Sequence, residues 1–254
     1  MPVKDATQRF SSRVDNYVRY RPAYPNEVVD LLKKECGLTS NSVVADIASG
    51  TGIFTRTLLE NGNRVFGVEP NDEMRRAGQR FLEGFPGFTS VTGSAEATTF
   101  PDHSVDIITA AQAAHWFDRE KARREFIRIL KPGGWTVFLW NERRTDSTPF
   151  LREYEHILLT YGTDYREVRH ERATAEIADF FAPSRFRSCR FEMRQEVDYT
   201  ALEGRLLSSS YTPTPDHAHY EPMLRELRRV FDAHQANGHV SLDYNTLVYY
   251  AQLA

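Results

Sequence analysis

Short apolar runs alternate with helically spaced apolar residues over the first half of the chain. Runs rich in β-branched residues predict buried strands, and apolar residues three or four positions apart predict amphipathic helices. Strands that alternate with helices in this way are typical of a parallel sheet with crossover helices. The strands are expected at residues 43–47, 64–69, 89–92, 105–110 and 135–140.

Helices around these strands are marked by spacing and by stop signals. Val14, Tyr17 and Val18 have helical spacing before the first strand. Pro22 should end that helix, because the residue before a proline avoids the α region. We interpret this leader as a flap over the ligand-binding edge of the sheet; a helix that only packs on the core is the alternative. Further helices are expected at 53–59, 72–81 and 119–130, the last ending at the turn 131–134.

The second half of the chain is less regular, and two more strands are expected there, at 186–197 and 246–251. We expect both to join the same sheet, so the predicted fold is α/β, with a doubly wound, mostly parallel seven-stranded sheet and a helical cap. One domain is expected over residues 1–254. Its cap is expected to draw on residues 1–24, 143–182 and 200–222. Helices in this half are expected at 150–161, 174–181, 202–207 and 223–234.

Composition narrows the class of protein. The 254 residues carry a net charge of −3 at pH 7, so nothing indicates the basic surface of a nucleic-acid-binding protein. The chain contains no run of about 18 apolar residues, and its start lacks the apolar core of a signal peptide. Cys36 and Cys189 are too few for a disulfide framework or a metal cluster. We therefore expect a cytoplasmic monomer or homodimer that acts on a small molecule and binds neither nucleic acid nor membrane.

The most informative stretch runs from Val43 to Gly52, where an apolar strand enters a glycine-rich turn before a helix. Gly50 and Gly52 have no Cβ, so a ligand can approach the backbone and positive φ angles cost little. The N-terminus of the following helix adds partial positive charge. Asp46, at the end of the strand, can accept hydrogen bonds from a ligand or from the turn. An ordinary loop with glycines for geometry alone is the alternative.

Two later strand ends carry groups suited to adenosine. Glu69 follows Asp46 by 23 residues, close to the spacing at which an acidic side chain binds ribose in dinucleotide sites. Pro70 stiffens the adjoining turn, and Met74 is a candidate to cover a purine face or, alternatively, to fill the core. The loop Gly93-Ser94-Ala95-Glu96 can read an adenine edge, unless it is a plain loop. Together these strand ends predict an adenosine site at the carboxyl edge of the sheet.

Glycine spacing separates two adenosine-bearing ligands. A dinucleotide fingerprint needs Gly-x-Gly-x-x-Gly, but Thr55 stands where the third glycine should follow Gly50 and Gly52. The observed pattern, Asp46-x-Ala48-x-Gly50-x-Gly52, resembles motif I of the class I S-adenosylmethionine-dependent methyltransferases. Later segments resemble further motifs of that family in order: Val68-Glu69-Pro70, Ser94-Ala95-Glu96, Ala110 to Phe117, and Leu130 to Gly134.

This resemblance covers about residues 40–141 and implies a Rossmann-like fold with S-adenosyl-L-methionine as cofactor. It implies that the turn passes the methionine portion, that Asp46 holds the turn or a bridging water, and that Glu69 binds the ribose. Ala111 would offer its carbonyl to the cofactor's amino group. The cofactor-binding residues that the resemblance implies are Tyr17, Arg21, Asp46, Ala48, Gly50, Gly52, Glu69, Pro70, Met74, Ser94, Ala95, Glu96, Ala111 and Gln112.

The ends of the chain extend the resemblance. The segments Tyr20 to Pro25 and Ser209 to Tyr211 are similar to the small-molecule branch that contains the trans-aconitate-type methyltransferases. In that branch Tyr17 and Arg21 would close over the carboxylate end of the cofactor. Ala48 departs from motif I, since the family has a glycine there. A negative φ would tolerate alanine at this position, whereas a positive φ would cost about 1 kcal/mol.

Methyl transfer from a sulfonium is an in-line displacement, so the protein mainly aligns the reactants and excludes water. His115 is the candidate catalytic residue, as a general base for an acceptor that must lose a proton. Packing of His115 against Trp116 is the alternative, and a carboxylate acceptor would need no base. The residues expected to contact substrate are Tyr20, His115, Trp116, Trp140 and Tyr211.

Three arginines, Arg21, Arg143 and Arg144, are candidates to attract an anionic substrate, with solvation at the surface as the alternative for the last two. His217 and His219 lack partner cysteines or carboxylates at metal-binding spacing, so no metal site is expected. Two other functions stay open from the sequence. One is a nicotinamide-dependent oxidoreductase on a similar sheet, and the other is a non-catalytic cofactor-binding protein with this fold.

Overall fold

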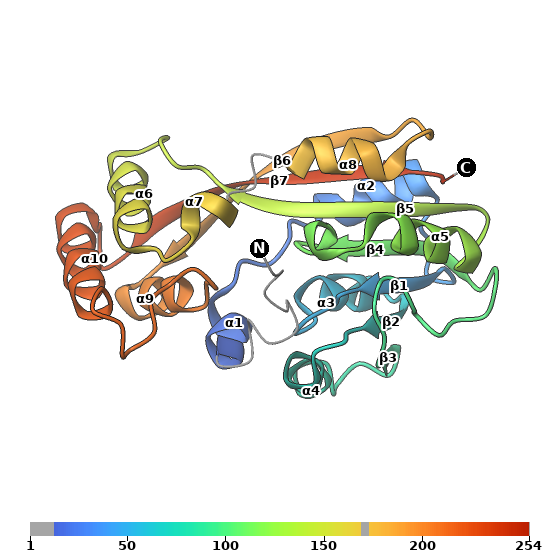
Figure 1. Ribbon diagram of the computed structural model, residues 1–254, viewed down its shortest axis with the longest axis horizontal. Helices are drawn as coiled ribbons and strands as arrows, with labels where there is room; N and C mark the ends of the chain where they lie inside the picture. Colours follow the sequence, from blue (N-terminus) through green and yellow to red (C-terminus); the bar gives the residue numbers. More distant parts are fainter. Residues whose placement is uncertain (1–12, 169–172, 254) are drawn as a thin grey trace.

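A seven-stranded sheet lies at the centre of the computed structural model, which describes residues 13–168 and 173–253 (Figure 1). Its strands are β1 (Val43–Ile47), β2 (Arg64–Val68), β3 (Phe88–Val91), β4 (Val105–Ala111), β5 (Leu130–Arg143), β6 (Arg187–Val197) and β7 (Val240–Ala251). They lie in the order β3-β2-β1-β4-β5-β7-β6. β7 is antiparallel to both of its neighbours, while β1 to β5 pair in parallel. The predicted doubly wound, mostly parallel α/β fold is confirmed.

Helices cover both faces of the sheet. On one face, Leu32 and Leu58 pack against Val44. On the other face, Phe126 and Phe181 pack against Ile108. Alternate residues of the central strands thus enter two apolar layers, as expected for a sheet buried on both sides. The helices are α1 (Val14–Tyr20), α2 (Glu27–Cys36), α3 (Ile53–Glu60), α4 (Asp72–Phe81), α5 (Arg119–Ile129), α6 (Pro149–Tyr161), α7 (Tyr165–Val168), α8 (Ala173–Phe181), α9 (Tyr199–Leu207) and α10 (Tyr220–His234).

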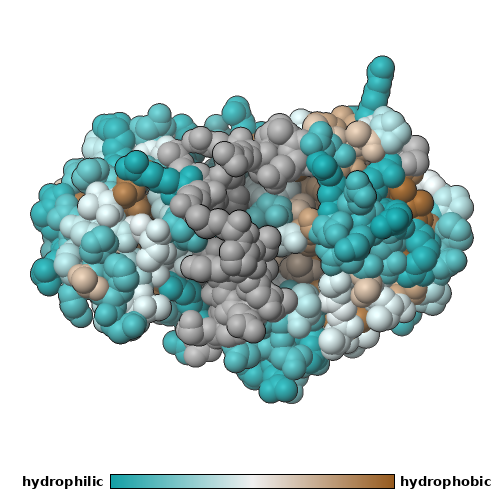
Figure 2. Space-filling view, in the orientation of Figure 1, coloured by the Kyte–Doolittle hydropathy of each residue, from teal (hydrophilic) through white to brown (hydrophobic). Residues whose placement is uncertain are grey.

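The three longest strands, β5, β6 and β7, carry the sheet into a second apolar cluster at one end (Figure 1). There α6, α9 and α10 bury Leu151, Leu206 and Leu227 against Leu242 of β7. α1 contacts α9, so the leader joins this end to the edge of the sheet. Residues 1–12 and 169–172 of the predicted cap lie outside the described residues. On the face seen in Figure 2, the described cap helices and α5 present mostly hydrophilic residues.

Most predicted elements match the structure, and α4 and β1 have the predicted bounds. β7 begins at Val240 rather than at residue 246, because it pairs with β6 along its whole length and the ladder holds Asp243 and Asn245 in the strand. Both residue types are poor strand formers in isolation, so pairing outweighs propensity here. β5 also begins earlier than predicted, at Leu130, and a register shift in its pairing with β4 accommodates the turn-forming residues. The short helices η2 (Ala114–Trp116) and α7 had not been predicted.

Candidate active site

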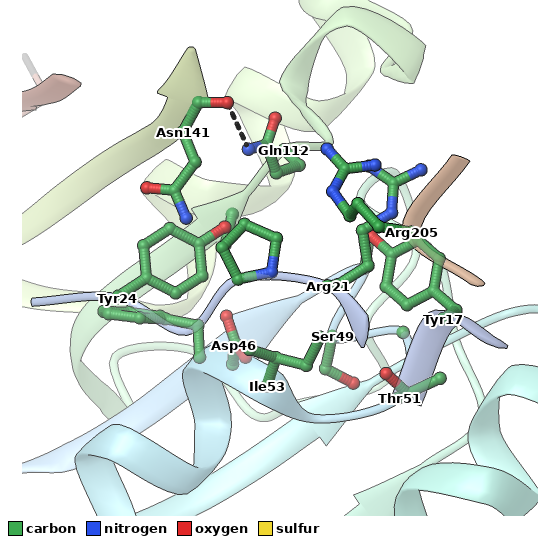
Figure 3. A pocket seen from close by; sticks show the side chains of 15 residues that line it. Tyr17, Arg21, Tyr24, Asp46, Ser49, Thr51, Ile53, Gln112, Asn141 and Arg205 are labelled. Carbon is green, nitrogen blue, oxygen red and sulfur yellow. Dashed lines mark hydrogen bonds between the residues drawn. The ribbon is translucent and has the colours of Figure 1, made fainter. Parts of the chain in front are cut away.

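A cavity lies at the carboxyl edge of the sheet, next to β1 and β4 (Figure 3). The strand order reverses between these two strands, and open α/β sheets bind their ligands at such a switch point. The lining comes from β1 and the turn that follows it, from the ends of β4 and β5, and from α1, α3 and α9. The predicted cofactor-binding residues that line it are Tyr17, Arg21, Asp46, Ala48, Gly50, Ala111 and Gln112.

The glycine-rich turn has a left-handed backbone at three positions. The φ angles are 54° at Ala48, 57° at Gly50 and 84° at Gly52. Ala48, the residue that departs from motif I, therefore has a positive φ. The negative φ that would tolerate alanine is not observed. A Cβ at Gly52 would lie 2.6 Å from Leu82 Cδ1, so packing as well as backbone conformation requires glycine there.

Asp46 is buried at the end of β1, and both of its carboxylate oxygens accept hydrogen bonds. Thr55 Oγ1 of α3 donates to Oδ2 at 2.6 Å, and Thr109 Oγ1 of β4 donates to Oδ1 at 2.8 Å. Burial raises the pKa of Asp46 to about 6, although the two hydroxyl donors oppose the rise. Asp46 thereby connects β1, β4 and the helix that follows the turn.

Glu69 supports the turn from the end of β2. Its Oε2 accepts a hydrogen bond from the backbone N–H of Gly50 at 2.9 Å, and its Oε1 accepts one from the N–H of Asn71, also at 2.9 Å. Burial raises the pKa of Glu69, while these two donors lower it. Each carboxylate oxygen has a second lone pair, so the group retains acceptor capacity for a ligand hydroxyl.

Glu69 and the other residues predicted for the adenosine end lie outside the cavity lining, and so does Gly52. Met74 is buried beside Val14 of α1, and Pro70 is exposed. Ala95 is buried on the α5 face, and Ser94 forms an isolated bridge with Ala97. Glu96 accepts a hydrogen bond from the Asp118 N–H at 2.9 Å, at the start of α5.

The leader helix places two predicted residues at the cavity and one away from it. The Arg21 guanidinium lies over the Tyr17 ring, 4.7 Å from its centroid. Both side chains line the cavity. Tyr20 instead packs on α9. Its ring lies so close to Gly204 that a Cβ added there would be 2.2 Å from the ring.

Two of the five predicted substrate residues, His115 and Trp140, lie at a second pocket. This pocket has a volume of about 270 Å³ and lies between η2, α5, α8 and β5. His115 and Trp140 line it with Phe117, Phe138 and Phe180, and His115 does not line the cavity at the turn. The buried Trp140 Nε1 has no hydrogen-bond partner among residues 13–168 and 173–253.

The other two predicted aromatic residues, Trp116 and Tyr211, contact neighbouring rings outside the two pocket linings. The Trp116 ring lies 4.7 Å from the His115 ring, between centroids, in the arrangement considered as the packing alternative. The Tyr211 ring lies 4.8 Å from the Tyr165 ring, in the cap. Neither Trp116 nor Tyr211 lines either pocket.

Sequence reasoning missed five polar residues of the cavity: Tyr24, Ser49, Thr51, Asn141 and Arg205. Gln112 connects two of them, since its side chain hydrogen-bonds Tyr24 and its Nε2 donates to the Asn141 carbonyl at 3.2 Å. Arg205 carried no usable signal, because it is one charged residue on a short helix far from the turn in sequence. Thr51 could have been identified from the sequence, because it lies between the two turn glycines, Gly50 and Gly52.

Arg143 and Arg144 do not reach the cavity. Arg143 Nη2 pairs with Glu155 Oε2 at 2.5 Å, and the guanidinium lies 4.8 Å from the centroid of the Tyr154 ring. Because Arg143 is paired in this way and does not line the cavity, the expectation that it attracts a substrate is wrong. The backbone N–H of Arg144 donates to the Asp243 carbonyl at 2.8 Å, at the extended end of β7.

The described part of the chain contains no group of three or more His, Cys, Asp or Glu residues placed to hold a metal ion. No helix within residues 13–168 and 173–253 is long and apolar enough to cross a membrane.

Comparison with known proteins identifies the class. Residues 45–138 match the family model described as a methyltransferase domain. An uncharacterised methyltransferase of Mycobacterium tuberculosis is 32% identical over 261 residues, covering 99% of this chain and 98% of that protein. An uncharacterised methyltransferase-like protein of Schizosaccharomyces pombe is 27% identical over 244 residues, covering 94% and 93%. The chain therefore belongs to the class I S-adenosylmethionine-dependent methyltransferases and is a methyltransferase enzyme.

Solved structures agree on the fold. A protein from Anaeromyxobacter dehalogenans assigned as a type II methyltransferase has a TM-score of 0.68 at 24% identity, covering 91% of this chain and 97% of its own. A phosphoethanolamine N-methyltransferase of Haemonchus contortus, in complex with phosphomonomethylethanolamine and S-adenosylhomocysteine, has a TM-score of 0.54 at 16% identity. The match covers 98% of this chain and 58% of that one.

Proposed function

We propose that this methyltransferase binds S-adenosyl-L-methionine at the glycine-rich turn and transfers its methyl group to a small molecule. The observation that carries the proposal is the position of the turn, at the switch point between β1 and β4 and in the wall of a cavity. Thr51 supports the fit, because its Oγ1 is buried there without a hydrogen-bond partner among the described residues. A buried hydroxyl normally has a partner, and a polar ligand in the cavity would supply one.

In this proposal, different residues of the chain bind different parts of the cofactor. The turn at Ala48, Gly50 and Gly52 receives the methionine portion, and Ala111 offers its carbonyl to the amino group beside Gln112. Tyr17 and Arg21 hold the carboxylate. Asp46 and Glu69 keep the turn in shape through the hydrogen bonds described above, and Glu69 keeps acceptor capacity for the ribose. The adenine end is assigned to Pro70, Met74, Ser94, Ala95 and Glu96.

When bound, the cofactor supplies an electrophilic methyl group on a positively charged sulfur. The protein has to align the acceptor with that methyl and exclude water, and such positioning can supply about 7–11 kcal/mol of the barrier. His115 is assigned to take a proton from acceptors that must lose one. Trp140 is assigned to shape the acceptor's surroundings, and its unpartnered Nε1 supports this role. Tyr20, Trp116 and Tyr211 line neither pocket and take no part in this assignment.

Residues 1–254 are taken as one catalytic domain, because β7 contributes residues both to the core clusters on the two faces of the sheet and to the cap cluster. A cytoplasmic monomer or homodimer that acts without nucleic acid or membrane remains part of this proposal. An acceptor of low molecular mass is favoured because α1 and α9 both contribute to the cavity wall at the end of the sheet.

Methyl-labelled S-adenosylmethionine tests the proposal when the enzyme is given two fractions of a cell extract. We expect label to enter the low-molecular-mass ultrafiltrate and not the retained protein and nucleic acid. The control is Gly50→Val, which places a side chain at a φ of 57° beside Met74 and should abolish transfer. Label that enters only the macromolecular fraction would overturn the small-molecule part of the proposal.

A further inference from the structure

The buried guanidinium of Arg205 and the half-buried guanidinium of Arg21 share one wall of the cavity (Figure 3). Arg21 donates from Nε to Ser208 Oγ at 3.0 Å and from Nη2 to the Ser208 carbonyl at 3.0 Å. Arg205 donates from Nε to Tyr244 Oη at 3.3 Å. Ser209 Oγ accepts from both arginines, at 3.4 Å from Arg21 Nη2 and 3.2 Å from Arg205 Nη1. This hydroxyl holds the two like charges side by side.

Each guanidinium has N–H donors that form no hydrogen bond with the described residues. A guanidinium has five N–H donors and no acceptor. Within the part of the chain that the structure describes, Arg21 Nη1 and Arg205 Nη2 have no hydrogen-bond partner. Because both residues line the cavity, a ligand there can reach these donors.

Neither guanidinium is paired with a carboxylate among residues 13–168 and 173–253. Burial lowers the pKa of Arg205 and the phenols of Tyr154, Tyr211 and Tyr244 raise it, so the groups that act on this guanidinium include no carboxylate. Burial and the charge of Arg205 both lower the pKa of Arg21, as expected where no counter-charge is close.

Arg143 provides an internal comparison, since it is also a buried arginine of the cap. It is paired with Glu155 at 2.5 Å and does not line the cavity. Buried charges are normally paired in this way, because an unpaired one is costly to desolvate. The two arginines that face the cavity are therefore the ones left without a counter-charge, which indicates that anions complete this wall.

We propose that Arg205 binds a carboxylate carried by the methyl acceptor, so that the substrate of this enzyme is a small organic acid. The inference rests on the proposed function, which assigns the single carboxylate of the cofactor to Tyr17 and Arg21. Arg205 then needs a second oxyanion, and the acceptor is the other molecule that enters the site. The planar fork of a guanidinium matches a carboxylate, which it binds through two parallel hydrogen bonds.

The test is calorimetric titration of the protein saturated with S-adenosylhomocysteine. Phenylacetate and succinate are the acids, and phenylacetamide and succinamide are the neutral controls of the same shape. We expect saturable binding of at least one acid and binding of its amide weaker by about tenfold or more. Failure of both acids to bind the wild-type complex would overturn the proposal, and so would equal binding of acid and amide.

Three variants locate the binding group. Arg205→Gln should lose the binding of the acid while its affinity for S-adenosylhomocysteine stays within about threefold of wild type. Arg229→Gln, which changes an exposed arginine on α10, should alter neither. If Arg205→Gln does not fold, Arg205→Lys takes its place, because it keeps the charge but loses the fork. That variant should bind the acid about tenfold more weakly with cofactor affinity retained.

Two outcomes separate this inference from the proposed function. If S-adenosylhomocysteine does not bind the wild-type protein, the proposed function fails before any acid is added. If it binds, and Arg205→Gln weakens it by the same factor as Arg21→Gln while acid binding is unchanged, Arg205 serves the cofactor and the inference is wrong.

Discussion

Glu69 Oε2 accepts a hydrogen bond from the backbone N–H of Gly50 at 2.9 Å, so the strand end predicted to bind ribose also supports the glycine-rich turn. The two residues lie 19 positions apart in sequence and follow neighbouring strands of the sheet, β1 and β2. A carboxylate at the end of β2 is therefore needed for the shape of the turn before any ligand arrives.

Glu69→Ala removes the acceptor of two backbone N–H groups, those of Gly50 and Asn71. We expect a loss of roughly 1–3 kcal/mol in the free energy of unfolding, the usual cost of unmaking such bonds, measured by urea denaturation. Affinity for S-adenosylhomocysteine should fall at the same time, because the turn loses its support. Glu73→Gln, at an exposed carboxyl group of α4, is the control and should change neither quantity.

Asp46 should make stability depend on pH in an unusual direction for a carboxyl group. Its pKa is raised by burial from 3.8 to about 6, so the folded state binds the proton more tightly than the unfolded state. The group's favourable contribution is therefore present below about pH 3.8 and is lost as the pH rises to about 6. This loss amounts to about 3 kcal/mol at most, from the size of the shift.

Asp46→Asn tests this sign, because asparagine resembles the protonated acid and does not titrate. The variant should be more stable than wild type at pH 7, and the difference should shrink as the pH falls from about 6 to about 4. Urea denaturation across that range measures it. A variant that is less stable than wild type by a constant amount at every pH would show that the ionised form of Asp46 is the favoured one.

Ala48→Gly should stabilise the protein. Ala48 has a φ of 54°, a conformation that costs an L residue about 1 kcal/mol or more and costs glycine little. We expect the free energy of unfolding to rise by about 1 kcal/mol, less the small entropic cost of glycine in the unfolded chain. Ala113→Gly is the matched control, because its φ is −126° and the same change there should destabilise. Equal effects at the two positions would contradict the backbone argument.

Gly204→Ala should separate the leader from the cap. A Cβ at this position would lie 2.2 Å from the Tyr20 ring, so α1 has to move away from α9. Since α1 carries Tyr17 and Arg21, we expect the dissociation constant of S-adenosylhomocysteine to rise by about tenfold, measured by calorimetry. Gly84→Ala adds the same methyl group where nothing lies within 4 Å and should leave the affinity unchanged. Unchanged affinity in Gly204→Ala would show that α1 does not hold the cofactor.

The turn was predictable from the sequence because its signals are local. An apolar run, two glycines and a helical spacing lie within Val43–Leu59, and each constrains the backbone through neighbouring residues. The extra length of β7 was not predictable in this way. Asp243 and Asn245 enter the strand because other strands pair with them, β6 with both and β5 also with Asn245, and these partners lie far away along the chain.

The composition of the cavity wall shows the same limit. Arg205 faces the cavity because α1 packs on α9, a contact between segments almost two hundred residues apart. Local sequence favoured Arg143, which stands beside Arg144 in a polar stretch, and gave no reason to select Arg205 between Gly204 and Leu206. In the folded chain Arg143 pairs with Glu155, whereas Arg205 pairs with no carboxylate of the described residues.

Titration of the wild-type protein with S-adenosylhomocysteine, alongside NAD, tests the central claim most directly. The account predicts one molecule of S-adenosylhomocysteine per chain with a dissociation constant of about 1–100 μM and no saturable binding of NAD in the same range. Binding of NAD without binding of S-adenosylhomocysteine would contradict the assignment of the turn to the methyl donor.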